Sequence, residues 1–175
     1  MRFLARRGGV PAEVRTRAAL PPGEPVLAWA EARDGTWLLG TRRRLVLVPP
    51  GEADVPTIPW EEVEDAAWDT EASRLRISEV GQFGQVRPAY SFEMEEPPRL
   101  LQLVRERVTS SILLQRRVRV RGRQAITVIG RRSPEGGEVR WMHAYDPGLD
   151  PDDPEVRRAA DAALAAAMAE VGQSP

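Results

Sequence analysis

The first half of the chain alternates between short apolar segments and polar turns. Turn residues recur about every eight to twelve positions, a spacing typical of antiparallel sheets. Asp34-Gly35 is a tight-hairpin signal between the first two apolar segments. We therefore predict six or seven short strands closed by one amphipathic helix. The strands are expected within residues 25–32, 36–40, 43–48, 57–60, 63–68, 74–78 and 89–94.

The longest helical pattern runs from Pro98 to Arg117. Its apolar residues recur at steps of three or four, which places them on one face of a helix. This face must be buried, and the preceding strands are the only large partner. We predict that Val104, Val108 and Ile112 pack against the strands of residues 24–94. The full apolar face comprises Leu100, Leu101, Leu103, Val104, Val108, Ile112 and Leu114.

Smaller patterns flank this central part of the chain. Residues 11–20 predict a short helix with Val14 and either Ala18 or Ala19 facing inward. Residues 124–130 and 139–145 predict a hairpin. A last helix follows, capped by Asp153, opened by Pro154 and ending near Val171. The expected organisation is an N-terminal tail and short helix (1–23), a main domain (24–117) and a ββα appendage (118–175).

The main domain carries a sequence pattern that resembles a known family. The segments TRRRLVLVPP and IPWEEVEDAAW, separated by a loop, are similar to those of bacterial pleckstrin-homology-like (PH-like) domains. The matching residues are Thr41, Arg44, Leu45, Ile58, Trp60 and Val63. The resemblance covers roughly Glu24 to Gln115, and the whole chain also resembles uncharacterised actinobacterial proteins. It implies an α+β fold, with an antiparallel PH-like barrel or sandwich closed by a helix.

Composition excludes several kinds of chemistry. The chain has no Cys and one His, so disulfides, thiolate metal sites, cysteine nucleophiles and multi-histidine metal sites are ruled out within one chain. We find no glycine-rich phosphate loop, nucleophile elbow or metal motif. His143 alternates with Trp141 and Tyr145, which indicates an aromatic strand face better than a catalytic site. We expect a cytoplasmic, non-enzymatic protein without catalytic residues, metal, cofactor or transmembrane segment.

Charge is concentrated in the middle of the chain. Residues 1–98 carry a net charge of −4, residues 99–140 carry +8 and residues 141–175 carry −5, and every basic residue is Arg. If residues 118–123 are extended, Arg119, Arg121 and Arg123, together with the preceding Arg117, lie on one face, and Val118 and Val120 lie on the other. Binding of phosphates and pairing with acids of this chain are both compatible with this pattern, and we favour the second. The candidate anion-binding residues are Arg117, Arg119, Arg121, Arg123, Arg131 and Arg132.

These patterns predict two classes of function. The first is a PH-like protein-interaction module whose protein partner the sequence does not identify. The alternative is an anion- or nucleic-acid-binding protein that uses the Arg117–Arg132 region. The first hairpin has only Arg33 beside Asp34, where lipid-binding PH-like domains carry a basic cluster, so we expect weak or no phosphoinositide binding. The sequence is compatible with a homodimer and does not decide the oligomeric state.

Overall fold

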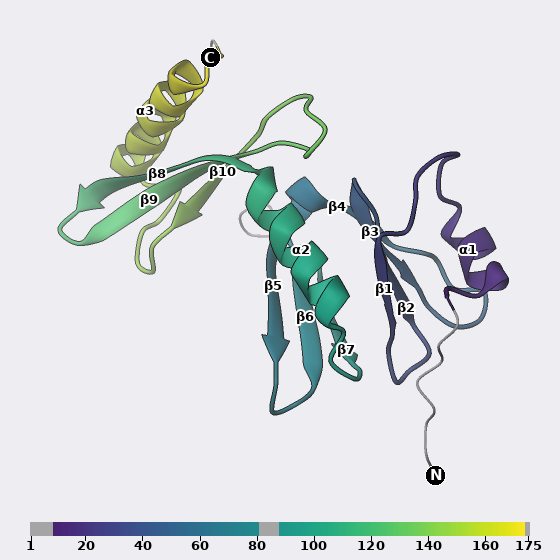
Figure 1. Cartoon of the computed structure of the whole chain (residues 1–175). Coiled ribbons are helices and arrows are strands. Elements are labelled where there is room, and N and C mark those ends of the chain that lie inside the picture. Colours follow the sequence, from purple (N-terminus) through teal and green to yellow (C-terminus); the bar gives the residue numbers. More distant parts are fainter. Residues whose placement is uncertain (1–8, 81–87, 174–175) are drawn as a thin grey trace. The chain divides into compact units, whose positions relative to one another are not determined.

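The computed structural model describes residues 9–80 and 88–173 (Figure 1). The chain divides into two compact units, Met1–Val108 and Thr109–Pro175, called unit 1 and unit 2 below. Within the described residues, ten strands form three antiparallel sheets, accompanied by three α-helices. The predicted mixed α+β class is confirmed, but the strands of this part of the chain do not close into a barrel.

Unit 1 contains a four-stranded and a three-stranded sheet, and each is a simple antiparallel meander. Every strand coincides with or falls close to a range expected from sequence. The first sheet comprises β1 (Ala28–Glu31), β2 (Trp37–Gly40), β3 (Arg44–Val48) and β4 (Thr57–Pro59), in that order. After a 3-10 turn (Trp60–Glu62), the second comprises β5 (Val63–Asp69), β6 (Arg74–Glu79) and β7 (Ala89–Glu93).

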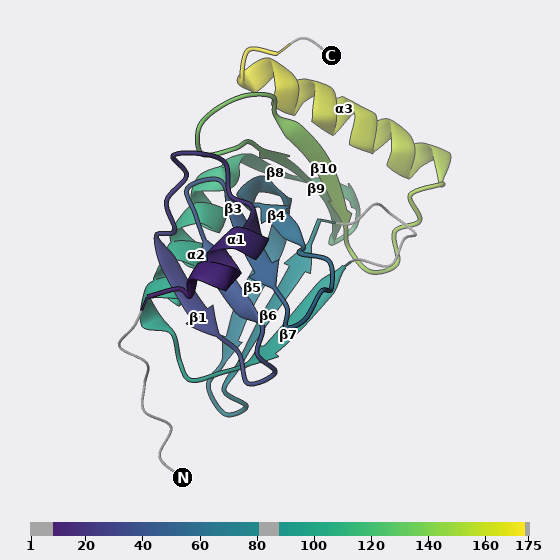
Figure 2. The ribbon, with the colours of Figure 1, turned by 90° about the vertical axis from the view of Figure 1, so that its right-hand side faces the viewer.

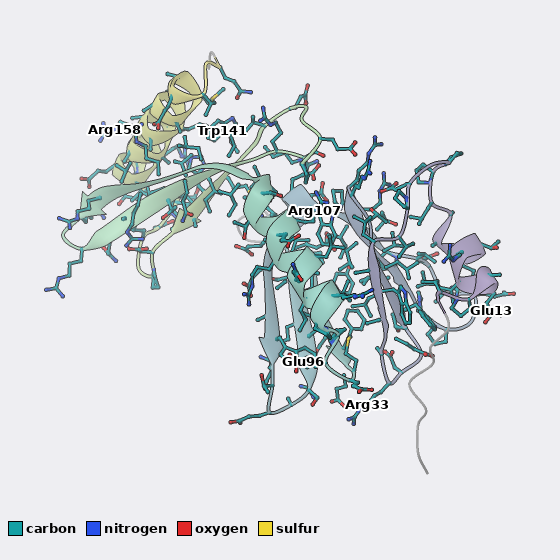
Figure 3. All side chains as sticks on the ribbon, in the orientation of Figure 1. Glu13, Arg33, Glu96, Arg107, Trp141 and Arg158 are labelled. Carbon is teal, nitrogen blue, oxygen red and sulfur yellow. The ribbon has the colours of Figure 1, made fainter. Side chains whose placement is uncertain are left out.

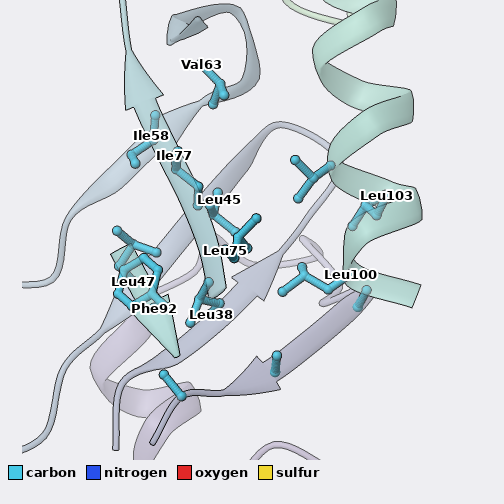
Figure 4. Close-up of a cluster of buried hydrophobic side chains, with 14 of the residues drawn as sticks. Leu38, Leu45, Leu47, Ile58, Val63, Leu75, Ile77, Phe92, Leu100 and Leu103 are labelled. Carbon is cyan, nitrogen blue, oxygen red and sulfur yellow. The ribbon is translucent and has the colours of Figure 1, made fainter. Parts of the chain in front are cut away.

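The main core of unit 1 combines inward side chains of both sheets with helix α2 (Pro98–Ser111). Leu75 and Ile77 alternate inward from β6, as predicted, and Leu100 enters from α2 (Figure 4). Val104 of α2 is buried in the same core. Gly40 lets α2 approach the first sheet, because a Cβ there would lie only 2.6 Å from a methyl carbon of Leu103.

The end of α2 differs from prediction. The helix stops at Ser111, and strand β8 (Ile112–Arg121) begins at the next residue. Val104 is buried and Val108 packs partly against the core, as expected, but Ile112 is a half-buried strand residue, so its predicted helical role is wrong. The apolar residues after Ser111 also fit a period of two, and pairing with β9 selects this period.

Helix α1 (Ala12–Ala18) covers the other face of the first sheet. Val14 and Ala18 are buried there with Trp37 and Leu39, which confirms the predicted inward positions. The four-stranded sheet is thus apolar on both faces. This explains why β2 is buried at every position instead of alternating.

Unit 2 is a three-stranded sheet covered on one face by helix α3 (Pro154–Glu170) (Figure 2). The strand order is β10 (Arg140–Tyr145), β9 (Gln124–Arg131) and β8. The predicted hairpin is β9–β10, and the Asp153 cap is confirmed, since its carboxylate accepts a hydrogen bond from the Glu155 N–H at 2.8 Å. Residues 118–123 were expected to be extended only as one interpretation of the arginine pattern, and the predicted ββα appendage did not include the third strand, β8. Without it, the hairpin would expose one edge of the buried central strand.

Candidate interaction site

The arginines of β8 form specific pairs within unit 2. Arg117 donates two hydrogen bonds to the carboxylate of Asp146, at 3.0 and 2.6 Å. The same carboxylate accepts the backbone N–H of Ala125 at 3.0 Å, which fixes it beside β9. The Arg117 hydrogen bonds are the main reason why the pKa of Asp146 is lowered. Arg117 is therefore one half of a bidentate pair.

Two further arginines of β8 pair with α3. Arg121 bonds both Asp153, at 2.9 Å, and Glu155, through its Nε at 2.9 Å. Asp153 has a lowered pKa, because the Glu155 backbone N–H and then Arg121 stabilise its charged form. Arg116 forms an ion pair with Glu170 at the other end of the helix, at 3.2 Å. These contacts connect β8 to both ends of α3.

The other candidate arginines have different surroundings. Arg119 and Arg123 are exposed, and neither forms an ion pair with any described residue. Arg131 is only 4% exposed, and its guanidinium donates a hydrogen bond to the Ser111 hydroxyl at 3.0 Å. Arg132 is exposed. The six arginines are thus not a uniform set of free cations, and anion binding stays a prediction.

Unit 1 exposes a different kind of surface. Leu27 and Trp29 are 42% and 36% exposed, two of the three most exposed large apolar side chains in the described part of the chain. The Trp29 ring lies 5.4 Å from that of buried Trp37, tilted by 39°. This arrangement follows from alternation along β1, where Ala28 and Ala30 point into the core and the intervening side chains point out. We call Leu27, Trp29, Glu31 and Trp37 the tryptophan face.

A groove of about 370 Å³ adjoins this face. Val14, Trp37 and Val48 provide apolar lining, and two acids, Glu13 of α1 and Glu31 of β1, contribute carboxylates (Figure 3 labels Glu13). Both acids are exposed, and neither carboxylate forms an ion pair or a hydrogen bond with a described residue. The complete lining is Pro11, Glu13, Val14, Arg17, Glu31, Gly35, Trp37, Val48, Pro49, Pro50 and Gly51.

Arg17 is the single cation of this lining, and its guanidinium is bonded to backbone carbonyl oxygens. Its guanidinium donates hydrogen bonds to the backbone carbonyls of Pro49 and Ala53, the latter at 3.0 Å. These bonds hold α1 to the loop after β3. The groove wall is consequently anchored without using either carboxylate.

A smaller hollow of about 290 Å³ lies beside β6 and β7. Tyr90 is in its lining and donates a hydrogen bond to Glu79 at 2.8 Å. Burial, followed by the interaction with Glu79, raises the pKa of Tyr90 to about 12. The phenol is therefore neutral near pH 7 and is not suited to act as a general base.

The predicted aromatic strand face in unit 2 is present. His143 is half-buried on β10, with its ring 6.1 Å from that of Tyr145, and is paired in register with Val128. Its Nε2 is buried and has no hydrogen-bond partner among the described residues. Across residues 9–80 and 88–173, no group of three or more His, Asp or Glu side chains is placed to hold a metal ion. No described helix is long and apolar enough to cross a membrane.

Sequence reasoning identified the arginines but not the groove. The outward Trp29-x-Glu31 alternation was a usable signal, since both side chains must leave the same side of β1. Glu13 gave no such signal, because its place beside β1 depends on how α1 docks. No protein-family model, curated protein or solved structure matches the chain.

Proposed function

We propose that the chain is a non-enzymatic protein-interaction module that binds a protein partner through the tryptophan face of unit 1. The observation that carries this proposal is the pair of exposed apolar side chains, Leu27 and Trp29, next to the groove-lining Trp37. Tryptophan is enriched at protein interfaces and in their energetic hot spots. Burial of the Trp29 ring by a partner would remove apolar surface from water.

We also propose that unit 1 is organised like a PH-like domain. Support comes from the order of its elements, four strands and then three strands followed by a helix. Three residues of the sequence resemblance, Thr41, Arg44 and Trp60, are connected by hydrogen bonds in this unit. Thr41 accepts the backbone N–H of Arg44 at 3.1 Å, and the indole of Trp60 donates to the Thr41 carbonyl at 3.1 Å. These bonds join the turn before β3 to the turn after β4.

The first hairpin supports a partner other than a phosphoinositide. Asp34 accepts the backbone N–H of Thr36 at 2.9 Å, so its carboxylate is fixed in the turn beside Arg33. The negative charge of this carboxylate would repel the phosphate of a lipid headgroup. In co-sedimentation with phosphoinositide-containing liposomes at physiological salt, we expect no headgroup-selective binding, and selective binding would contradict this part of the proposal.

The experiment is an affinity capture from native lysate with three forms of the full chain as bait. Trp29→Ser removes the exposed ring of the tryptophan face. Leu113→Ser is the matched control, because Leu113 is a similarly exposed apolar residue of unit 2. We expect a protein captured by the parent and by Leu113→Ser but lost with Trp29→Ser. Equal capture by all three folded baits would contradict the proposal.

Anion or nucleic-acid binding through unit 2 is the second candidate. The observation that favours it is the exposure of Arg119 and Arg123 without an ion-pair partner among the described residues. The pairing of Arg117 and Arg121 with acids of the same unit weakens it. We therefore place it behind the interaction module.

A further inference from the structure

We infer that the groove next to the tryptophan face binds a cationic side chain, arginine or lysine, of a peptide segment in the protein partner. This inference rests on the proposed function and specifies the chemistry of the partner. The expected occupant is a positively charged peptide segment.

The first argument is charge complementarity. Glu13 and Glu31 come from different elements, α1 and β1, and both line the same groove. Neither carboxylate is neutralised by a described residue, and the guanidinium of Arg17 is bonded to carbonyl oxygens instead. A guanidinium or ammonium group entering the groove would find two carboxylate acceptors whose charges are not already paired.

The second argument is the apolar part of the groove. Arginine and lysine side chains carry a long aliphatic stem below the charged group, and this stem packs well on apolar surfaces. The partly or fully exposed rings of Pro11, Pro49 and Pro50 supply such a surface beside the acids, above the buried side chains of the groove floor. A small inorganic cation would gain nothing from these side chains. The combination therefore favours an amphipathic side chain.

The third argument is the position of Trp29. Trp29 and Glu31 are two residues apart on β1, so their side chains leave the same side of the strand. Glu31 is paired in register with Trp37, and the Trp29 ring lies 5.4 Å from that of Trp37. A cation held by Glu31 thus lies next to an exposed indole, which favours cations over its face. The chain surrounding that cation would then cover Trp29.

The test uses the full chain and a defined probe. Acetylated, amidated peptides of identical sequence carry arginine, lysine or citrulline at one central position, and citrulline keeps the shape of arginine without its charge. Binding is followed by NMR chemical shifts of the Trp29 and Trp37 indole groups and the Glu13 and Glu31 amides. We expect saturable shifts with the arginine and lysine peptides, and much smaller shifts with the citrulline peptide.

Two variants identify the site. Glu13→Gln/Glu31→Gln keeps the shape of the groove and should weaken arginine-peptide binding about three- to tenfold, the effect of two partly exposed charge contacts. Glu71→Gln is the control, because it removes an exposed carboxylate of the same unit outside the groove lining. Equal binding of the citrulline peptide, or undiminished binding to the folded double variant, would overturn the inference.

The inference and the proposed function can fail separately. Capture that depends on Trp29 but is unchanged by Glu13→Gln/Glu31→Gln would keep the interaction module and reject the cation-binding groove. Charge-dependent binding of the arginine peptide, with equal lysate capture by the Trp29→Ser and parent baits, would support the groove and reject the tryptophan face as the main contact.

Discussion

Arg117 and Asp146 form a bidentate ion pair, with two nitrogen–oxygen distances of 3.0 and 2.6 Å. Arg117 belongs to the most basic part of the chain, and this pair shows that one of the arginines there already has an anionic partner. Arg119 lies two residues further along β8, and it has no such partner among the described residues. Arg117 is therefore held in an intramolecular ion pair, whereas Arg119 is free to contact an external anion.

The first prediction concerns polyanions. We expect no binding of single- or double-stranded oligonucleotides near physiological salt, and at most weak binding at low salt that disappears as salt is added. Fluorescence anisotropy with labelled oligonucleotides measures this. Arg119→Ala/Arg123→Ala removes two exposed arginines that form no ion pair with a described residue. It leaves intact the ion pair of Arg117 with Asp146 and those of Arg121 with Asp153 and Glu155. Micromolar or tighter binding by the parent at moderate salt, weakened in this variant, would support the nucleic-acid alternative.

The second prediction concerns acid stability. The pKa values of Asp146 and Asp153 are lowered in the folded chain, so the unfolded chain binds protons more readily at these groups. Their contribution to stability is present above the unfolded pKa, about 4, and is lost as pH falls through the lower folded values. Thermal melts should show unit 2 losing stability below about pH 4.

The matched variant for this experiment is Asp146→Asn. It keeps a polar acceptor for the Ala125 N–H but abolishes the charge next to Arg117. It should be less stable than the parent at pH 7, and the difference should shrink as pH falls. A constant difference across the whole pH range would exclude the Asp146 charge as its cause.

The arrangement of unit 1 follows from local sequence patterns far more than that of unit 2 does. Leu75 and Ile77 alternate without ambiguity, and Val14 and Ala18 lie on one side of a short helix. The segment around Ile112 and Leu114 satisfies two periods at once, and sequence alone favoured the wrong one. The pairing of β8 with β9 decides between them, and it starts from a two-residue turn at Gly122-Arg123 with Gly122 at φ 54°. This turn is a local hairpin signal that the helical interpretation did not use.

The candidate site likewise combines features that follow from local sequence patterns with features that depend on tertiary packing. Exposure of Trp29 follows from strand alternation, whereas the groove forms only when α1 packs on the face of the four-stranded sheet. Likewise, the pairing of Arg121 with Asp153 depends on where α3 starts relative to the end of β8. Charge totals predicted that pairs would form, but they could not identify Arg119 and Arg123 as the arginines without an ion-pair partner among the described residues.

The third prediction concerns α2. Val104 is 3% exposed in the core of unit 1, so Val104→Asp should lower the free energy of unfolding by roughly 3 kcal/mol or more, because it buries an unpaired charge. Gln102→Asp is the control on the same helix, since Gln102 is exposed and the change in charge is identical. Thermal denaturation followed by circular dichroism compares them. An unchanged melt for Val104→Asp would contradict the packing of α2 on the sheets.

The last prediction concerns the close approach of Gly130 and Trp141 in unit 2. These residues are paired in register on β9 and β10, and a Cβ on Gly130 would lie 2.7 Å from the indole ring. The indole is also held by a hydrogen bond from its Nε1 to Gln173, at 3.0 Å, so it is not free to move aside. We expect Gly130→Ala to cost about 1–3 kcal/mol through overpacking.

A double-mutant cycle tests this cause. With Trp141→Leu present, the rigid ring is gone, and Gly130→Ala should be close to neutral or slightly stabilising, since alanine restricts the unfolded chain more than glycine does. Chemical denaturation of the four proteins gives the coupling free energy. A Gly130→Ala penalty of the same size in both backgrounds would mean that the indole is not what excludes a side chain at this position.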